Sequence, residues 1–126
     1  MKISKIFEEK GEVFFRNIEE KITLNILKKK NIIISLGGGS FLNKKIQKEI
    51  LDNHTSFWLY WDRTVIINRI KKSSKRPIAH KLTLFELNHL IKKRSNIYSK
   101  ALYKIDCNGL SKKEVVKKIF DIYETN

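Results

Sequence analysis

Three consecutive glycines, Gly37 to Gly39, are the first residues of this sequence whose type and spacing suggest chemistry. The chain has only five glycines, and these three directly follow the largely apolar run 32–36. Glycine lets the backbone approach a ligand closely and leaves N–H groups exposed to hydrogen-bond that ligand. A tight turn between a strand and a helix, with no ligand, is the alternative. The motif therefore needs support from other residues.

Arginine is also scarce, and four of the five arginines lie in short stretches with recognisable spacing: Arg16, Arg69, Arg76 and Arg94. Arg16 precedes Glu19 by three residues and Arg94 precedes Tyr98 by four, which places each pair on one face of a helix. Arginine binds carboxylates and phosphates through a bidentate fork that lysine cannot reproduce. Taken alone, the spacing of Arg16 and Glu19 is also typical of a surface ion pair that binds no ligand. Arg76, directly before the only proline, could equally be an ordinary exposed loop residue.

An alternation of helices and strands has to position these residues. Apolar runs predict strands at 31–36, 56–61 and 103–108, the first buried on both faces. Apolar spacing predicts helices at 12–30, 43–52 and 63–72, and capping boxes at 83–86 and 111–114 open two more. This order predicts one α/β domain over residues 1–126 with a mostly parallel sheet. Such sheets bind ligands at the carboxyl ends of their strands, where the glycines lie.

Two of these helices carry a defined apolar stripe. The stripe of the first helix consists of Phe14, Ile18, Ile22 and Ile26. The last helix is expected to turn five apolar side chains inward, namely Val115, Val116, Ile119, Phe120 and Tyr123. Stripes at this spacing are typical of helices that pack on a core.

Composition limits the possible functions. The formal net charge of +14 suits either nucleic acid or small anionic substrates. The lysines are scattered, however, and no arginine-rich stripe alternates with aromatic residues, so nucleic-acid binding is disfavoured. The single Cys107 excludes an internal disulfide, and no apolar run approaches the ~20 residues of a transmembrane helix. We expect a soluble cytoplasmic domain with no membrane partner, and the histidines are not at metal-ligand spacing.

Four stretches, taken in order, resemble the shikimate kinase family: "IFEEKGEVFFRNIEE", "IISLGGGSF", "KRPIAH" and "RSNIYSKA". The resemblance runs from about residue 3 to the C-terminus. Shikimate kinases are small P-loop kinases of the nucleoside-monophosphate-kinase type. They transfer the γ-phosphate of ATP to the 3-hydroxyl of shikimate, with Mg²⁺, in the route to chorismate and the aromatic amino acids. The resemblance therefore implies ATP and shikimate as the small-molecule partners.

The residues that the resemblance implies in shikimate binding are Arg16, Glu19, Phe7, Phe15, Gly37, Gly38, Gly39 and Arg94. In the family pattern the two arginines grip the carboxylate and the glutamate orients Arg16. The glycine backbone holds the ring hydroxyls, and the two phenylalanines pack against the ring. Without the resemblance, the apolar spacing of the two phenylalanines would indicate that both pack in the core.

Three further residues are implied in the handling of ATP. Arg76 resembles the lid arginine that closes over the phosphates and takes part in catalysis. Arg69 would lie near the adenine and the phosphates. Ser35 resembles the polar residue that supports the Mg²⁺ shell, although a hydroxyl inside an apolar strand is usually a satisfied core group.

A feature that shikimate kinases share is absent from these 126 residues. A P-loop reads G-x-x-x-x-G-K-[ST], and no glycine here is followed by such a lysine. We therefore expect the three-layer parallel sheet of the P-loop kinases without its first strand, P-loop, first helix and second strand. The strands at 31–36 and 56–61 would then lose their shared neighbour. Such a chain should have no significant kinase activity by itself.

Three explanations for the missing P-loop remain open. The sequence is a fragment, or begins at an internal methionine, of an ordinary shikimate kinase whose full-length form we expect to be monomeric. It is otherwise a non-catalytic paralogue that keeps a carboxylate-binding site, or a basic nucleic-acid-binding module. A carbohydrate kinase for another hydroxylated substrate is disfavoured, because Arg16 with Glu19, and Arg94, suit a carboxylate.

Overall fold

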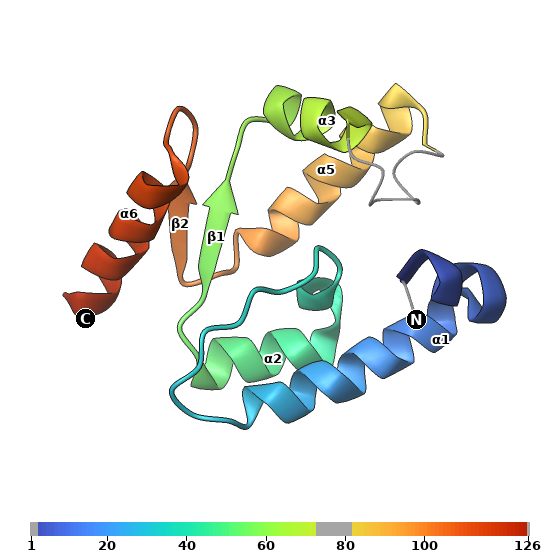
Figure 1. The fold of residues 1–126 in the computed structure, drawn as a ribbon, viewed down its shortest axis with the longest axis horizontal. Helices are drawn as coiled ribbons and strands as arrows, with labels where there is room; N and C mark the ends of the chain where they lie inside the picture. Colours follow the sequence, from blue (N-terminus) through green and yellow to red (C-terminus); the bar gives the residue numbers. More distant parts are fainter. Residues whose placement is uncertain (1–2, 73–81, 126) are drawn as a thin grey trace.

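The computed structural model (Figure 1) describes residues 3–72 and 82–125, with side chains from residue 10 onward. Its elements, in chain order, are α1 (Ile3–Leu27), η1 (Ser40–Leu42), α2 (Lys44–Asn53), β1 (Phe57–Tyr60), α3 (Arg63–Lys72), α5 (Leu84–Tyr98), β2 (Tyr103–Asp106) and α6 (Lys112–Glu124). From α2 onward the described elements follow the predicted order: a helix, a strand, two helices, a strand and a final helix. None of the described helices is both long and apolar enough to cross a membrane.

Local signals in the sequence explain where the helices begin. Thr83 and Ser111 each accept a hydrogen bond from the backbone of a glutamate three residues later, and that glutamate reaches back to the capping residue. Both predicted capping boxes are thereby confirmed. The side chain of Asn43 accepts hydrogen bonds from the N–H groups of Lys45 and Ile46 and so opens α2. Each cap satisfies backbone donors that a helix otherwise leaves unpaired.

The described sheet consists of two parallel strands. β1 and β2 pair in the register Phe57 with Tyr103 through Tyr60 with Asp106. This pairing confirms the predicted strands around 56–61 and 103–108, and it confirms the parallel α/β class. α6 lies beside β2 (Figure 1). Ile105 of β2, Cys107 just after it and Val115 of α6 form one buried cluster.

The predicted strand at 31–36 is wrong. The segment forms no strand, and Ile33 is fully exposed instead of buried, with a relative accessibility of 102%. The physical reason is that a strand needs a neighbour to bond its N–H and C=O groups. Within the described residues, β1 pairs with β2 alone, and no strand lies beside 31–36.

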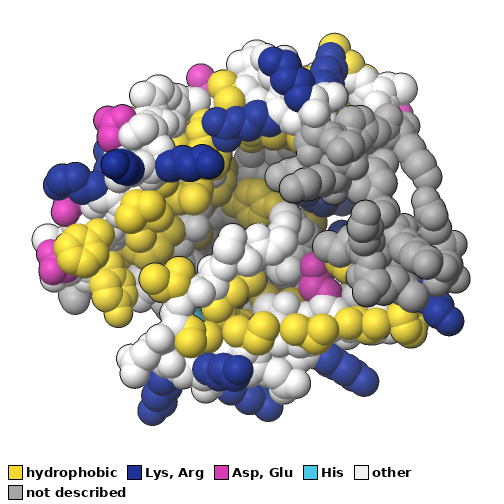
Figure 2. Space-filling view, in the orientation of Figure 1, with side chains coloured by type: hydrophobic (Ala, Val, Ile, Leu, Met, Phe, Trp, Pro, Cys, Tyr) yellow, Lys and Arg dark blue, Asp and Glu magenta, His cyan; other side chains and the backbone are white. Residues whose placement is uncertain are grey.

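The apolar stripes of the first and last helices are also predicted only in part. α1 packs through Leu24 and Leu27, whereas Phe14, Ile22 and Ile26 are exposed. α6 buries Val115 and half-buries Ile119, but its Val116, Phe120 and Tyr123 are exposed. Figure 2 shows hydrophobic side chains gathered on one hollowed face of the molecule. Periodicity identified apolar faces but not which of them this chain covers.

A glycine breaks the first helix into two parts. Gly11 has φ 84° and ψ 169°, so the helical ladder is interrupted there, and the predicted helix 12–30 is the longer part, ending at Leu27. This backbone region is almost closed to residues that carry a side chain. A methyl group at Gly11 would meet no atom within 4 Å, so the restriction comes from the backbone alone.

Candidate substrate-binding site

The three consecutive glycines lie between two helices that are distant in sequence. A methyl group built on Gly39 would lie 2.5 Å from Nη1 of Arg16, a residue of α1. One built on Gly38 would lie 3.2 Å from Nη1 of Arg94, a residue of α5. The loop turns into η1 through a hydrogen bond from the Ser40 N–H to the Gly37 carbonyl, at 3.1 Å. Bare backbone at these positions therefore gives two guanidinium groups room to approach.

Arg16 is held in place by carboxylates of its own helix. Its Nη1 lies 2.8 Å from Oε1 of Glu19, one turn on, and its Nε lies 3.8 Å from Oε1 of Glu12, one turn back. The guanidinium also lies over the ring of Phe15, 5.1 Å from the centroid. Glu19 reaches the glycines as well, since a methyl group on Gly37 would lie 3.5 Å from its Oε2. Arg16 is thus oriented and partly neutralised before any ligand binds.

The part of α1 that carries Arg16 is fixed against α2 by a polar contact. Asn43 donates a hydrogen bond from Nδ2 to Oε2 of Glu20 at 3.0 Å, and Nζ of Lys45 lies 3.5 Å from Oε1 of Glu20. The hydrogen bond from Asn43, and then the charge of Lys45, lower the pKa of the Glu20 carboxyl below its ordinary value. The cap of α2 therefore also positions the helix that bears Arg16.

α5 supplies the second arginine together with a tyrosine. Arg94 and Tyr98 are four residues apart and share a face of the helix. The Tyr98 hydroxyl donates a hydrogen bond to the Gly38 carbonyl oxygen. Nε of Arg94 is buried, and no acceptor among the described residues bonds to it. A buried donor without a partner is costly unless something binds there, and a guanidinium calls for an anion.

Two guanidinium groups that face one glycine loop form an arrangement whose chemistry suits an anion. Arginine presents donors in a planar fork that fits a carboxylate. Glycine backbone beside that fork can hydrogen-bond neutral hydroxyl groups of the same molecule. The arrangement therefore suits a small ligand with a carboxylate at one end and hydroxyl groups at the other.

Comparison with known proteins identifies the family. A family model described as shikimate kinase matches residues 1–124. The chain belongs to the shikimate kinase family. A shikimate kinase of Thermodesulfovibrio yellowstonii is 37% identical over 125 residues, which are 98% of this chain and 72% of that protein. A shikimate kinase of Bacillus subtilis is 35% identical over an alignment of 127 positions, gaps included, which covers 96% of this chain and 66% of that protein.

Solved structures of shikimate kinases share the fold. The crystal structure from Aquifex aeolicus matches with a TM-score of 0.80 and 30% identity, covering 98% of this chain and 73% of that one. The enzyme from Acinetobacter baumannii, solved in complex with shikimate, matches with a TM-score of 0.89 and 24% identity, covering 99% and 71%. The fold is therefore the α/β fold of this P-loop kinase family.

The remaining residues that the shikimate kinase pattern implies lie in different places. Phe15 is half-buried beside Arg16, where it can form part of a ring-binding wall. Ser35 is exposed in the segment that forms no strand, so it is not a core hydroxyl. The side chain of Phe7 and the whole of Arg76 lie outside the described residues. Their predicted roles remain predictions.

Arg69 lies in the last turn of α3 and contacts an aromatic residue rather than the glycine loop. Its guanidinium is 4.8 Å from the centroid of the Trp61 ring. Trp61 lines a cavity of about 510 Å³ that begins at the carboxyl end of β1. The ends of parallel strands are where this class of sheet binds ligands. The structure thus places the Trp61 side chain between this cavity and Arg69.

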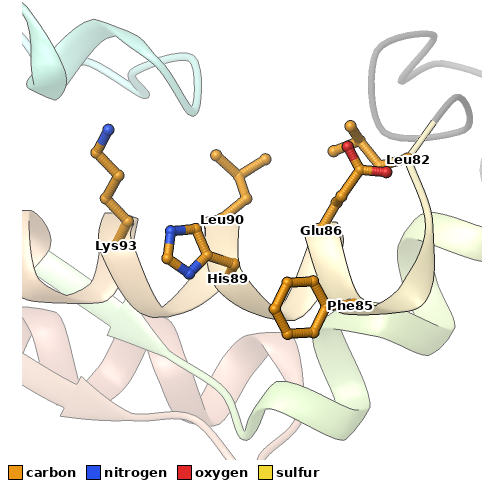
Figure 3. Close-up of a pocket in the computed structure, with 6 residues that line it drawn as sticks. All are labelled: Leu82, Phe85, Glu86, His89, Leu90 and Lys93. Carbon is orange, nitrogen blue, oxygen red and sulfur yellow. The ribbon is translucent and has the colours of Figure 1, made fainter.

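A second cavity, of about 310 Å³, lies along α5 from Phe85 to Lys93, and no residue of the glycine loop lines it. Its six labelled side chains come from Leu82 and one face of that helix (Figure 3). They include Glu86, His89 and Lys93 but no arginine. Neither Arg94 nor Tyr98 lines it, so it does not extend the site.

Sequence reasoning missed two residues of the site. Glu12 contacts Arg16, and its spacing of four residues on a helix was a usable signal. Tyr98 was noted beside Arg94 but received no role. Its bond to Gly38 joins residues 60 positions apart, and no local pattern contains that information.

Proposed function

We propose that this chain carries the substrate-binding part of a shikimate kinase, which transfers the γ-phosphate of ATP to the 3-hydroxyl of shikimate. The observation that carries the proposal is the convergence of Arg16 and Arg94 on the three glycines. Membership of the shikimate kinase family supports the same substrate. Shikimate has one carboxylate and three ring hydroxyls, which is the ligand chemistry that this arrangement suits.

In this proposal the arginines hold the carboxylate and the glycine backbone holds the ring. Arg94 donates hydrogen bonds to the carboxylate, and its donors include the buried Nε. Glu19 keeps the guanidinium of Arg16 aligned. Fixing both ends of a small rigid ligand presents one hydroxyl in a defined direction. Phosphoryl transfer depends mainly on such positioning and on charge stabilisation. The net charge of +14 also favours the approach of an anion.

The phosphate half of the site is less complete in this chain. ATP and Mg²⁺ are the co-substrate and metal that the family implies, with Arg69, Arg76 and Ser35 as the predicted contacts. No group of three His, Cys, Asp or Glu side chains gathers among the described residues, so they form no metal site built from protein ligands alone. In kinases Mg²⁺ is held by one or two protein oxygens together with the phosphates of the nucleotide. The 126-residue sequence also has no G-x-x-x-x-G-K-[ST] motif.

The first test is shikimate binding by the purified 126-residue chain, measured by isothermal titration calorimetry. Arg94→Lys keeps the charge but loses the fork, and we expect the affinity to fall about ten- to hundredfold. Arg63→Lys, at the exposed start of α3, is the matched control and should leave the affinity unchanged. No binding by the unmodified chain, or equal binding by the Arg94→Lys variant, would contradict the proposal.

The second test is shikimate-dependent formation of ADP by the same chain. We expect none, because the P-loop lysine and its backbone normally bind the β- and γ-phosphates. Binding without turnover supports the proposed substrate site and assigns catalysis to a polypeptide that also contains a P-loop. Robust turnover by these 126 residues would refute the expected inactivity while leaving the substrate assignment intact.

A further inference from the structure

Tyr98 reaches the same glycine as Arg94, although it is not one of the ligand-binding residues proposed above. Its hydroxyl hydrogen-bonds the Gly38 carbonyl oxygen. A methyl group on Gly38 would lie 3.2 Å from Nη1 of Arg94 and 3.7 Å from the Tyr98 hydroxyl. One turn of α5 thus presents a charged donor and a neutral donor to one point of the loop.

The bond from Tyr98 has a consequence for the next backbone donor. A peptide unit is planar and trans, so the C=O of Gly38 and the N–H of Gly39 point in opposite directions. When Tyr98 fixes that carbonyl, it also turns the Gly39 N–H away from α5. No hydrogen bond from the Gly39 N–H is present among the described residues. The donor is therefore oriented and available.

The tyrosine is itself supported by the sheet. Its ring lies 6.3 Å from the ring of Trp58 on β1, centroid to centroid. Nζ of Lys104 on β2 lies 5.0 Å from the Trp58 centroid on the same strand pair. Consecutive glycines have no side chains to pack, so their conformation needs an external restraint. The contacts from the sheet through Tyr98 to Gly38 provide one.

We propose that Tyr98 is a positioning residue that fixes the Gly38–Gly39 peptide, so that the Gly39 N–H hydrogen-bonds a ring hydroxyl of the substrate. The inference rests on the proposed function and deepens it. The arginines select a carboxylate, and Tyr98, through the glycine backbone, selects a hydroxylated ring over a bare one. Tyr98 does not contact the carboxylate and does not take part in proton transfer.

The experiment compares two ligands and two variants of the 126-residue chain. The ligands are shikimate and cyclohex-1-ene-1-carboxylate, which has the same carboxylate and ring but no hydroxyl groups. Tyr98→Phe removes only the hydroxyl. The matched control is Tyr103→Phe, because Tyr103 is also half-buried but stacks on Phe57 of the sheet. Affinities are measured by calorimetry, and the melting temperature shows that each variant folds.

For Tyr98→Phe we expect shikimate affinity to fall about three- to tenfold, the effect of one neutral hydrogen bond, with the affinity for the bare carboxylate unchanged. Tyr103→Phe should change neither affinity. Equal loss for both ligands would mean that Tyr98 only supports the fold, and no loss for either would mean that it does not position the loop. Both outcomes overturn the proposal.

A readout without ligand separates this inference from the proposed function. In the ¹H–¹⁵N NMR spectrum of the free chain, Tyr98→Phe should shift the amide signals of Gly38 and Gly39 more than those of Gly109. Unshifted loop signals would refute the positioning role even if shikimate binds. Shifted signals in a chain that binds no shikimate would refute the proposed function and, with it, the selection of a hydroxylated ring.

Discussion

Replacing Gly39 by alanine tests the geometry of the site most directly. The new methyl group would lie 2.5 Å from Nη1 of Arg16 and 2.8 Å from its Cζ. Non-bonded heavy atoms rest at about 3.5 Å or more, so the guanidinium has to withdraw by about 1 Å. That shift breaks the hydrogen bond from Nη1 of Arg16 to Oε1 of Glu19, which is 2.8 Å long and keeps the guanidinium aligned. A charge-assisted hydrogen bond contributes about 1.5–3 kcal/mol, so shikimate affinity should fall about ten- to hundredfold.

The same substitution should have little effect on stability. Gly39 has φ −97° and ψ −11°, a conformation that alanine adopts without strain. The atoms that must move belong to the end of a flexible side chain, and alanine restricts the unfolded chain more than glycine does. The free energy of unfolding should therefore change by less than about 1 kcal/mol. Urea denaturation measures this quantity, and calorimetry measures the affinity.

Alanine at the two other glycines provides graded controls. A methyl group on Gly37 would meet its nearest atoms at 3.5 and 3.6 Å, which is ordinary contact, and one on Gly38 would meet Arg94 at 3.2 Å. The loss of affinity should therefore increase from Gly37→Ala through Gly38→Ala to Gly39→Ala. Equal losses at all three positions, or unfolding of the Gly39→Ala variant, would refute the reasoning from the position of Arg16.

Three further predictions concern stability. Ile46→Ala should cost about 2–5 kcal/mol in urea denaturation because Ile46 is fully buried, whereas the exposed Ile33→Ala should change it by less than about 0.5 kcal/mol. Ser111→Ala should cost about 1 kcal/mol in the same assay, because it removes the cap of α6; no loss would contradict the capping box. Burial raises the pKa of the Cys107 thiol above its ordinary value of 9.0. As the pH rises, the Cys107 thiol therefore ionises in the unfolded chain before it ionises in the folded chain. The stability that the buried thiol contributes is fully present below its ordinary pKa and is lost as the pH rises through the pKa of the folded state. Denaturation at about pH 8 and pH 10 should show this loss, and Cys107→Ala should lack it.

The parts of the fold that the sequence predicted depend on local signals. The boxes at Thr83 and Ser111 need residues only three apart, and the two paired strands are short apolar runs. The segment 31–36 has the same kind of run but forms no strand, because strand formation depends on a neighbour and not on composition. The exposed faces of α1 and α6 differ from prediction for a similar reason. Periodicity gives a face, and only tertiary contacts decide whether it is covered.

The candidate site was predictable to a different extent. The scarcity and spacing of arginine indicated Arg16 and Arg94, and the run of glycines indicated the loop. What brings them together is the packing of α1 and α5 on either side of that loop, which no local pattern contains. The hydrogen bond from Tyr98 belongs to the same class of long-range information.

The break in α1 at Gly11 makes handedness a constraint on the site. With φ 84° and ψ 169°, the backbone there is close to the mirror image of an ordinary extended residue. A methyl group would meet no atom within 4 Å, so volume is not what restricts the position. An L-alanine would therefore have to change the course of the chain directly before Glu12 and five residues before Arg16, whereas a D-alanine would fit the existing path. The direction of the helix that carries Arg16 therefore depends on glycine, the one achiral amino acid among the twenty.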